Sequence, residues 1–248
     1  MRDIILITGG SGGIGAATAF LAARRGYTVC INYLCNRGAA EALVEQIRRD
    51  GGDAIAIGAD ISLEADVQRL FETIDESLGR ITALVNNAGI LEAQMRVEEM
   101  DADRLRRIFA TNVIGSFLCA RQAVRRMSAK HGGAGGAIVN VSSAASRIGA
   151  PGEYVDYAAS KGAIDTMTVG LAREVAAEGI RVNAVRPGLI YTDIHASGGE
   201  PQRIDRLKDS IPMRRGGWPD EVANAILWLL SDQASYVNGA IVDVTGGR

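Results

Sequence analysis

A tyrosine and a lysine one helical turn apart have the spacing in this sequence that most directly suggests acid–base chemistry. Tyr157 and Lys161 stand four positions apart in the run YAASK, so on a helix both project from one face, about 5–6 Å apart. An ammonium about 5 Å from the phenol, at an effective dielectric near 20, favours the phenolate by about 3 kcal/mol. We therefore expect the Tyr157 pKa to be lowered toward neutrality. Such a phenol can donate a proton to a carbonyl or accept one from an alcohol.

A serine upstream of this pair is a candidate partner. Ser143 directly follows the apolar run AIVNV, fourteen positions before Tyr157. A hydroxyl at the carboxyl end of a strand can bond a substrate oxygen and stabilise alkoxide charge that develops there. Ser142 and Ser146 are rivals for this role, and a lone serine here is more often a turn or cap residue. A Tyr–Lys pair alone is likewise more often a solvated helix face, so the prediction of a site depends on the three residues together.

The first turn of the chain is rich in glycine. The run TGGSGGIG, residues 8–15, follows the apolar run IILIT and precedes a helical pattern. Glycines let backbone amides approach an anion, and the N-terminus of the next helix adds its dipole, so the turn predicts a pyrophosphate site. The spacing Gly9-x-x-x-Gly13-x-Gly15 differs from the usual G-x-G-x-x-G, and a purely structural turn is the alternative.

Short apolar runs alternate with longer helical patterns along the chain, which is typical of a parallel sheet. The runs are rich in Ile and Val, as in strands that are buried on both faces. Right-handed crossovers then predict one doubly wound, seven-stranded α/β sheet, a Rossmann fold, in a single domain over residues 1–248. We expect strands at Ile4–Thr8, Thr28–Asn32, Ala54–Ile57, Ala83–Asn86, Ala137–Val141, Arg181–Val185 and Ala240–Val242, and helices near 14–25, 38–50, 64–78, 102–130, 153–178 and 219–231.

One segment, at about 187–218, interrupts this alternation. It contains Pro187, Pro201 and Pro212 and two Gly-Gly pairs, with no strand-like run of its own. Long insertions in a compact domain are usually functional or disordered. Because this one follows the carboxyl end of a strand, we expect it to cover the substrate; a decorative surface loop is the alternative.

Composition excludes several classes of protein. Among 248 residues, 27 Lys and Arg against 29 Asp and Glu give a formal net charge of -2, which argues against a nucleic-acid module or a polybasic membrane binder. No apolar run is long enough to span a membrane, and the N-terminus lacks the pattern of a signal peptide, so we expect a cytoplasmic protein. Three cysteines cannot form a disulfide framework, and two isolated histidines are too few for a zinc site, so we expect no metal.

The ordered motifs resemble the short-chain dehydrogenase/reductase family in its compact single-domain form. They are TGGSGGIG, Asp60 in ADIS, NNAG at 86–89, Asn112 in TNVIGS, Ser143, YAASK, and PGLIYT at 187–192, and they cover nearly the whole chain. The resemblance implies an NAD(P)-dependent enzyme that moves a hydride between a nicotinamide cofactor and a ketone or secondary alcohol. The runs EYVDYAASKGAID and HASGGEP are similar to bacterial sugar-dehydrogenase-like members, which makes a sugar a candidate substrate.

The resemblance also implies a role for each matching residue. Tyr157 would be the acid/base, Ser143 would orient the substrate, Lys161 would hold the nicotinamide ribose, and Asn112 would hold a water in a proton relay through Lys161. Asp60 would bond the adenine amino group, although it could also be a helix N-cap. Asn112 could instead be an ordinary polar helix residue and Thr192 a turn former. The implied cofactor contacts are Gly9, Ser11, Gly13, Ile14, Gly15, Asp60, Ile61, Asn87, Ala88, Gly89, Tyr157, Lys161, Pro187, Gly188, Ile190 and Thr192, with Asn86 also stabilising the central sheet.

Two features depart from the common family pattern. The interval from Ser143 to Tyr157 is one residue longer, which reshapes the substrate pocket. The expected second strand ends in Asn32-Tyr33-Leu34 without the carboxylate that would repel a 2′-phosphate, and Arg37 follows. Asn32 and Arg37 are therefore candidate contacts for that phosphate. We favour NADP over NAD, although Gly12 stands where many NADP-preferring relatives carry Arg.

Several alternatives remain open. Within the same class, a 3-oxoacyl-[acyl-carrier-protein] reductase is the second candidate, and from another class a nucleotide-sensing protein without turnover. The arginines of the 102–130 helix are expected to form the solvated face of an amphipathic helix, above an apolar stripe that includes Leu105 and Phe117. The family resemblance implies that this helix and the Tyr157 helix pair across a dimer interface, in a homodimer or homotetramer.

Overall fold

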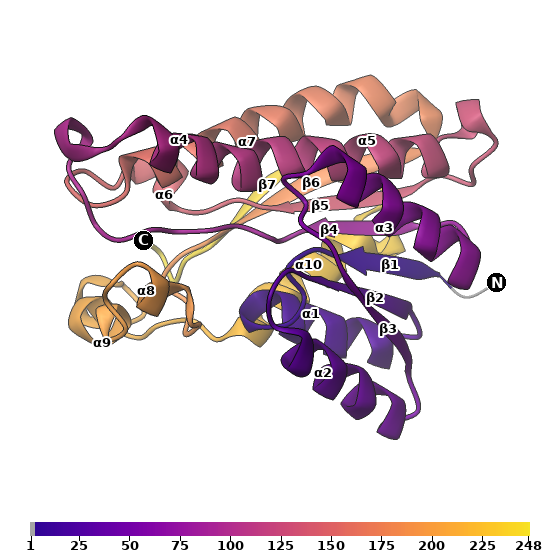
Figure 1. Ribbon diagram of the computed structural model, residues 1–248, viewed down its shortest axis with the longest axis horizontal. Coiled ribbons are helices and arrows are strands. Elements are labelled where there is room, and N and C mark those ends of the chain that lie inside the picture. Colours follow the sequence, from indigo (N-terminus) through magenta and orange to yellow (C-terminus); the bar gives the residue numbers. More distant parts are fainter. Residues whose placement is uncertain (1–2) are drawn as a thin grey trace.

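A seven-stranded, all-parallel sheet forms the centre of the protein, whose computed structural model describes residues 3–248 (Figure 1). The strands lie in the order β3-β2-β1-β4-β5-β6-β7, so the chain reverses direction across the sheet between β1 and β4. This confirms the predicted doubly wound Rossmann fold. The strands are β1 (Ile4–Ile7), β2 (Thr28–Tyr33), β3 (Asp53–Gly58), β4 (Ala83–Asn86), β5 (Gly136–Val141), β6 (Ile180–Pro187) and β7 (Ile241–Val244).

Side chains of strands β1 to β6 alternate between two apolar cores, one on each face of the sheet. In β1, Ile5 and Ile7 pack on one face, and Ile4 and Leu6 pack on the other. Because both faces are covered, every residue of β1 is buried, as the continuous apolar run predicted.

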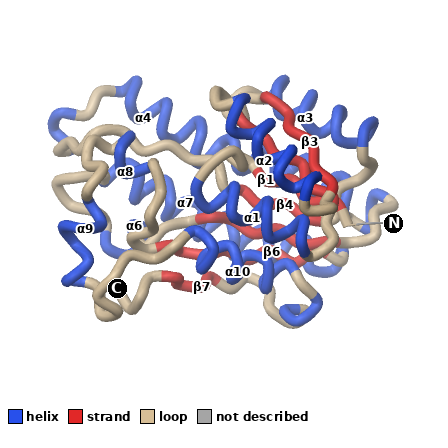
Figure 2. The backbone as a smooth tube through the Cα atoms, turned by 90° about the horizontal axis from the view of Figure 1, so that it is seen from below, coloured by secondary structure: helices blue, strands red, loops and turns tan. Residues whose placement is uncertain are grey.

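Helices form a layer on each side of the sheet (Figures 1 and 2). The core of one face includes residues of α1, α2 and α10, and that of the other includes residues of α3, α5 and α7. These helices span α1 (Gly13–Arg24), α2 (Arg37–Arg49), α3 (Glu64–Ser77), α5 (Ser116–Met127), α7 (Val155–Val175) and α10 (Pro219–Leu230).

The predicted helix 102–130 is not continuous. It consists of α4 (Ala102–Phe109), a π-helical turn η2 (Ala110–Gly115) and α5. Single π turns inside helices are uncommon and frequently mark functional sites, and they leave no obvious signature in sequence. Asn112 lies in the middle of this turn.

Most arginines of α4 and α5 lie on the solvated face that we expected, and Arg104 is the clear exception. Arg104 is only 3% exposed, and Arg107, Arg121 and Arg126 pair with Glu92, Glu64 and Asp75. The expected apolar stripe is also partly wrong, because Leu105 and Phe117 are 39% and 52% exposed.

Short helices complete the fold around one end of the sheet. They include η1 (Val97–Glu99) after β4, α6 (Ala145–Ile148) after β5, and α8 (Ile194–Ser197) and α9 (Arg203–Leu207) within the 187–218 segment. Three further helical turns, η3 (Ala129–His131), η4 (Ala176–Glu178) and η6 (Asp232–Ala234), precede β5, β6 and β7, and η5 (Lys208–Ser210) follows α9. Across residues 3–248, no helix has the length and apolar character needed to cross a membrane.

Candidate functional site

A cleft of about 940 Å³ opens at the carboxyl ends of the strands, beside the neighbouring strands β1 and β4, where the strand order reverses. Open α/β sheets bind their ligands at this position. Gly15, Arg37 and Asn112 are predicted site residues that do not line the cleft. The predicted site residues that do line it are Gly9, Ser11, Gly13, Ile14, Asn32, Asp60, Ile61, Asn87, Ala88, Gly89, Ser143, Tyr157, Lys161, Pro187, Gly188, Ile190 and Thr192.

The glycine-rich turn presents the N-terminus of α1 to this cleft. Its N-cap residue is Gly12, and no side chain caps the helix. The first backbone N–H groups of an uncapped helix are available to an anion, and the helix dipole favours negative charge there. Gly13 has φ +51°, and a Cβ atom on it would lie 3.1 Å from the Thr192 side chain. Glycine at this position therefore leaves room for Thr192 against the turn.

Gly15 does not line the cleft, and a glycine is needed here because of close packing. A Cβ atom at this position would lie 2.5 Å from both Asn87 Nδ2 and Gly9 O. The Asn87 amide donates to the carbonyl oxygens of Thr8 and Gly9, at 2.9 and 3.0 Å. Asn87 therefore fixes the glycine-rich turn against the end of β4, and Gly15 permits that approach.

The far end of the cleft is formed by the loops after β2 and β3. Asp60 lines it and accepts hydrogen bonds from the Ser62 amide and hydroxyl through Oδ1, so it caps a turn rather than helix α3. Leu34, Cys35 and Asn36 also line this end, which sequence reasoning missed. None of the three is acidic, so the wall after β2 carries no charge that would repel a phosphate.

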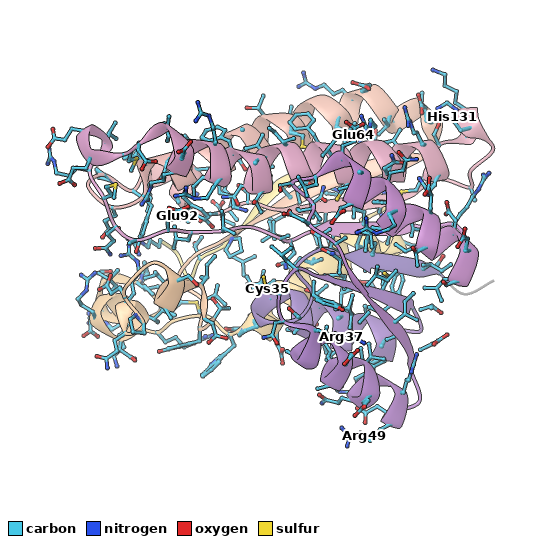
Figure 3. All side chains as sticks on the ribbon, in the orientation of Figure 1. Cys35, Arg37, Arg49, Glu64, Glu92 and His131 are labelled. Atoms are coloured by element: carbon cyan, nitrogen blue, oxygen red, sulfur yellow. The ribbon has the colours of Figure 1, made fainter. Side chains whose placement is uncertain are left out.

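Asn32 and Arg37, the two candidate phosphate contacts, lie in different environments. Asn32 is 2% exposed; its amide donates to Ala59 O at 3.0 Å, and its Oδ1 lies 3.4 Å from the Gly9 amide. Its polar atoms thus hold the backbone together, a role that the strand pattern did not reveal. Arg37 begins α2 and pairs with Glu41 at 2.7 Å, with its side chain 73% exposed. Figure 3 labels Cys35 and Arg37 where β2 gives way to α2.

Tyr157 and Lys161 meet at the other end of the cleft, on α7. Lys161 is 4% exposed, and its Nζ lies 5.6 Å from the centre of the Tyr157 ring and donates to Val141 O at 2.7 Å. Burial lowers the pKa of Lys161 to about 8, which Asp165 partly opposes. The predicted geometry of the pair is therefore present.

The expected direction of the Tyr157 pKa is wrong for the protein without cofactor. Burial raises the pKa of Tyr157, and only a hydrogen bond with Ser143 opposes this. The Coulomb estimate from one ammonium left out the loss of water around the phenol, which disfavours the phenolate. The phenol is consequently neutral at physiological pH.

Ser143 is distinguished from its two rivals by what each hydroxyl bonds. Ser142 donates to Lys161 O at 3.1 Å, and Ser146 donates to Ser143 O at 2.8 Å. Both hydroxyls are used to hold the backbone. The Ser143 hydroxyl instead accepts from the Ala145 amide, at 3.1 Å, and takes part in the hydrogen bond with Tyr157. Of the three, only Ser143 interacts with the phenol.

Asn112 lies behind the reaction centre and not in the cleft wall. Its Oδ1 accepts from the Ile90 amide at 2.7 Å, and its Nδ2 donates to Ile90 O and to Ser160 Oγ, at 3.0 and 3.1 Å. A Cβ atom on Gly89 would lie 3.4 Å from both Asn112 Oδ1 and Lys161 Nζ. Asn112 is therefore a neighbour of Lys161 whose side chain holds the segment after β4.

Asn86 also lies outside the cleft lining. Its Nδ2 donates to Asn140 Oδ1 at 2.9 Å, and Asn140 in turn donates to Thr168 Oγ1 at 2.9 Å. These buried bonds join β4, β5 and α7 at the centre of the sheet, in agreement with the stabilising role expected for Asn86.

The wall beyond Tyr157 is a small apolar cluster with polar groups at its rim. Leu91, Ala150, Tyr154 and Ala158 pack together beside Tyr157 and Ile194. At the rim, Arg203 on α9 pairs with Glu153 and Glu200 and lies over the Tyr154 ring. The interval from Ser143 to Tyr157, which we expected to be one residue longer than in the family, contributes Ala150, Glu153 and Tyr154 to the cleft. The segment 187–218 contributes Ile194, His195 and Arg203 to the cleft, and sequence reasoning had named none of these three as site residues.

The cleft can accommodate a dinucleotide with a small substrate beside it. Its volume is at the upper end of the range for ligand pockets. An uncapped helix N-terminus for a pyrophosphate lies on one side, and a neutral phenol with a serine and a lysine on the other. This arrangement suits proton transfer to a reacting oxygen next to a bound nicotinamide.

Comparisons with known families agree with this geometry. The family model described as enoyl-(acyl carrier protein) reductase matches residues 9–248. The chain is 61% identical over 245 residues to the uncharacterized oxidoreductase YgfF of Escherichia coli, with 99% of each chain covered. It is 37% identical over 242 residues to glucose 1-dehydrogenase 2 of Bacillus subtilis, covering 98% of this chain and 93% of the relative.

Two solved structures are similar over almost the whole chain. A 3-ketoacyl-(acyl-carrier-protein) reductase from Brucella melitensis, complexed with NADH, has a TM-score of 0.91 and 34% identity, covering 99% of this chain and 98% of that one. A short chain dehydrogenase from Burkholderia cenocepacia, in complex with NADP, has a TM-score of 0.89 and 30% identity, covering 99% and 97%. Both nicotinamide cofactors thus occur among proteins of this fold and similarity.

Proposed function

The chain belongs to the short-chain dehydrogenase/reductase family and is an NAD(P)-dependent oxidoreductase. From this premise we propose that it reversibly reduces a ketone to a secondary alcohol with NADPH. Tyr157 is the proton donor, Ser143 orients the carbonyl oxygen, and Lys161 holds the ribose of the cofactor. The observation that carries the proposal is the convergence of these three side chains in one cleft with the uncapped N-terminus of α1.

The protonation states support the reductive direction. Burial keeps the Tyr157 phenol neutral, and a neutral phenol is the form that donates a proton. A bound nicotinamide supplies the hydride. The Ser143 hydroxyl donates a hydrogen bond to the carbonyl oxygen of the substrate and stabilises the negative charge that develops on it. Tyr157 then transfers its proton to that oxygen, with the buried Lys161 beside it.

The preference for NADP over NAD rests on the loop after β2. Leu34, Cys35 and Asn36 form the wall where a carboxylate would repel a 2′-phosphate. The neighbouring Arg37 is exposed and tied to Glu41 by one ion pair, which costs little to break at a surface. We therefore keep Arg37 as the phosphate contact and assign Asn32 to holding the backbone. The remaining predicted cofactor contacts keep their assignments. Gly15 acts through its contact with Asn87, and Asn112 acts through its neighbour Lys161.

The substrate class has two candidates within this reaction. Similarity to glucose 1-dehydrogenase 2 favours a sugar, and similarity to a 3-ketoacyl-(acyl-carrier-protein) reductase favours an acyl thioester. A spectrophotometric screen separates them, using NADPH and NADH with ethyl acetoacetate and acetoacetyl-coenzyme A, and NADP⁺ and NAD⁺ with glucose. A nucleotide-sensing protein without turnover would bind cofactor and transfer hydride to none of these.

Tyr157→Phe tests the assignment of the proton donor. We expect kcat to fall by about 10²–10⁴-fold, because one positioned acid contributes this much, while NADPH binding is unchanged. Isothermal titration with NADPH measures the binding, and a turnover close to that of the wild type would contradict the assignment.

Location and assembly follow as part of the same proposal. We place the protein in the cytoplasm, acting on a small molecule as a homodimer or homotetramer. Exposed apolar side chains on η2 and α5 support an interface there, since Ile114 and Phe117 are 51% and 52% exposed. Light scattering of the purified protein measures the assembly, and a monomer would contradict it.

A further inference from the structure

A buried ion pair joins α4 to the first turn of α7. Arg104 Nε donates to Asp156 Oδ2 at 2.7 Å, and the two side chains are 4% and 0% exposed. No other ion pair in residues 3–248 has both side chains so completely buried. Burying an ion pair rarely stabilises a fold more than apolar side chains of similar volume would. Stability alone therefore does not account for this pair.

Asp156 directly precedes Tyr157 and holds its backbone. Its Oδ1 accepts from the Tyr157 amide at 2.8 Å, at the N-terminal end of α7, where the helix dipole favours a carboxylate. The Tyr157 carbonyl accepts from Ser160 Oγ at 2.7 Å, and Ser160 Oγ accepts in turn from Asn112. The backbone of Tyr157 is thus fixed at its N–H and at its C=O, by side chains anchored in α4 and η2.

Arg104 also ties this turn to the segment that follows β4. Its Nη1 donates to Ala93 O at 2.7 Å, in the segment that follows β4. Ile90 and Leu91 of that segment line the cleft. Glu92, labelled in Figure 3, pairs with Arg107, one turn along α4 from Arg104. A single guanidinium therefore contacts both the turn that carries Tyr157 and the segment whose Leu91 packs beside that turn.

We propose that Arg104 and Asp156 are a positioning pair for Tyr157. The inference rests on the proposed function, because it assigns a task to the residues that hold the proton donor. Neither side chain lines the cleft, so both act through Tyr157 and do not touch the substrate. Fixing the first turn of α7 against α4 and the 90–93 segment keeps the phenol within reach of the carbonyl oxygen. A misplacement of about 1 Å is enough to cost about 100-fold in rate.

The test removes both charges together, because removing one would leave the other buried and unpaired. In Arg104→Met/Asp156→Leu we expect kcat for reduction of ethyl acetoacetate by NADPH to fall by about 10–100-fold. We expect the KM for NADPH to stay within about twofold, since the pair does not reach the cofactor cleft. Asp103→Leu/Arg106→Met is the matched control, because that pair lies on the same helix with side chains 74% and 75% exposed, and we expect it to keep the wild-type kcat.

The Tyr157→Phe background distinguishes positioning from general damage. If the pair acts through the phenol, the charge-free double substitution should change the residual rate of Tyr157→Phe by less than about twofold. An equal loss in both backgrounds would overturn the proposal, as would an unchanged kcat in the wild-type background. Failure of the proposed function is separate: it would appear as full activity in Tyr157→Phe itself.

Arg104→Lys keeps the inference testable if the double variant does not fold. A lysine retains the charge opposite Asp156 but cannot donate to both Asp156 and Ala93 O in the fixed geometry of a guanidinium. We expect kcat to fall by about 3–10-fold with an unchanged KM for NADPH and an unchanged melting temperature. A kcat equal to that of the wild type in this variant would refute the positioning role.

Discussion

Lys161→Met should make the cofactor-free protein more stable at neutral pH while it removes activity. Lys161 is 4% exposed, and its burial lowers the pKa of the amine from 10.5 to about 8. Between these two values the unfolded chain binds a proton that the folded chain does not. The stability of the wild type therefore rises as the pH rises from about 8 toward 10.5, and below pH 8 the protein carries the full cost of a buried ammonium.

The lowered pKa sets the magnitude of this effect. At 1.36 kcal/mol for each pKa unit, a change from 10.5 to about 8 corresponds to about 3 kcal/mol at neutral pH. Loss of the hydrogen bond from Nζ to Val141 O offsets about 1 kcal/mol of this. We therefore expect Lys161→Met to be about 2 kcal/mol more stable than the wild type at pH 7. The difference should shrink by about 1.4 kcal/mol for each pH unit above 8.

Urea unfolding of both proteins without cofactor, at several pH values from about 7 to 9.5, measures this difference. Burial raises the pKa of the Cys30 and Cys119 thiols, so their contribution to stability is present below the unfolded thiol pKa and is lost as the pH rises above it. This loss is the same in both proteins and cancels in the difference. Lys130→Met, at an exposed lysine, is the control and should show no such dependence. A variant that is less stable at pH 7, with a difference that does not change with pH, would refute the reasoning.

Two further pairs of substitutions test the two ends of the cleft. Ser143→Ala should lower kcat by about 100-fold with unchanged NADPH affinity, because one donor to the developing oxyanion contributes about this much. Ser146→Ala is the control, and its kcat should stay within a few-fold of the wild type. Comparable losses of kcat in both variants would assign the effect to the turn and not to the Ser143 hydroxyl. Arg37→Ala should weaken NADP⁺ binding about tenfold and leave NAD⁺ binding unchanged. Glu41→Ala, which releases the Arg37 guanidinium, should strengthen NADP⁺ binding. Calorimetric titration measures both affinities, and equal changes for the two cofactors would remove Arg37 from the phosphate site.

The parts of this fold that could be predicted are those that depend on local pattern. Strands β1 to β7 are apolar runs, and each predicted strand has an observed counterpart that differs by at most a few residues at its ends. The spacing of Tyr157 and Lys161 on one helix brought both residues to the cleft, since four positions are one helical turn. The alternation of apolar runs with helical patterns also predicted the doubly wound sheet, because right-handed crossovers leave few possible arrangements of the strands.

What could not be predicted depends on contacts between distant parts of the chain. Arg104 looked like one more arginine of an amphipathic helix, and only its meeting with Asp156 explains its burial. Asn32 looked like a polar residue at a strand end, yet its side-chain amide is bonded to Ala59, just after β3, and to the glycine-rich turn. The direction of the Tyr157 pKa followed from the amount of water lost around the phenol, which a pairwise charge estimate does not contain.

The π turn η2 places a constraint on how this chain can vary in length. An α-helix turns by about 100° per residue, and a π turn accommodates one more residue than an α turn does. Deleting a single residue within 110–115 would therefore convert the π turn into an α turn and leave α4 and α5 in nearly the same relative rotation. The same deletion between 105 and 109, inside α4, would rotate Arg104 by about 100° away from Asp156 when Cys119 of α5 is kept in the core. The loss of one residue should therefore be tolerated better in this stretch, outside Asn112, than in the α-helices on either side of it.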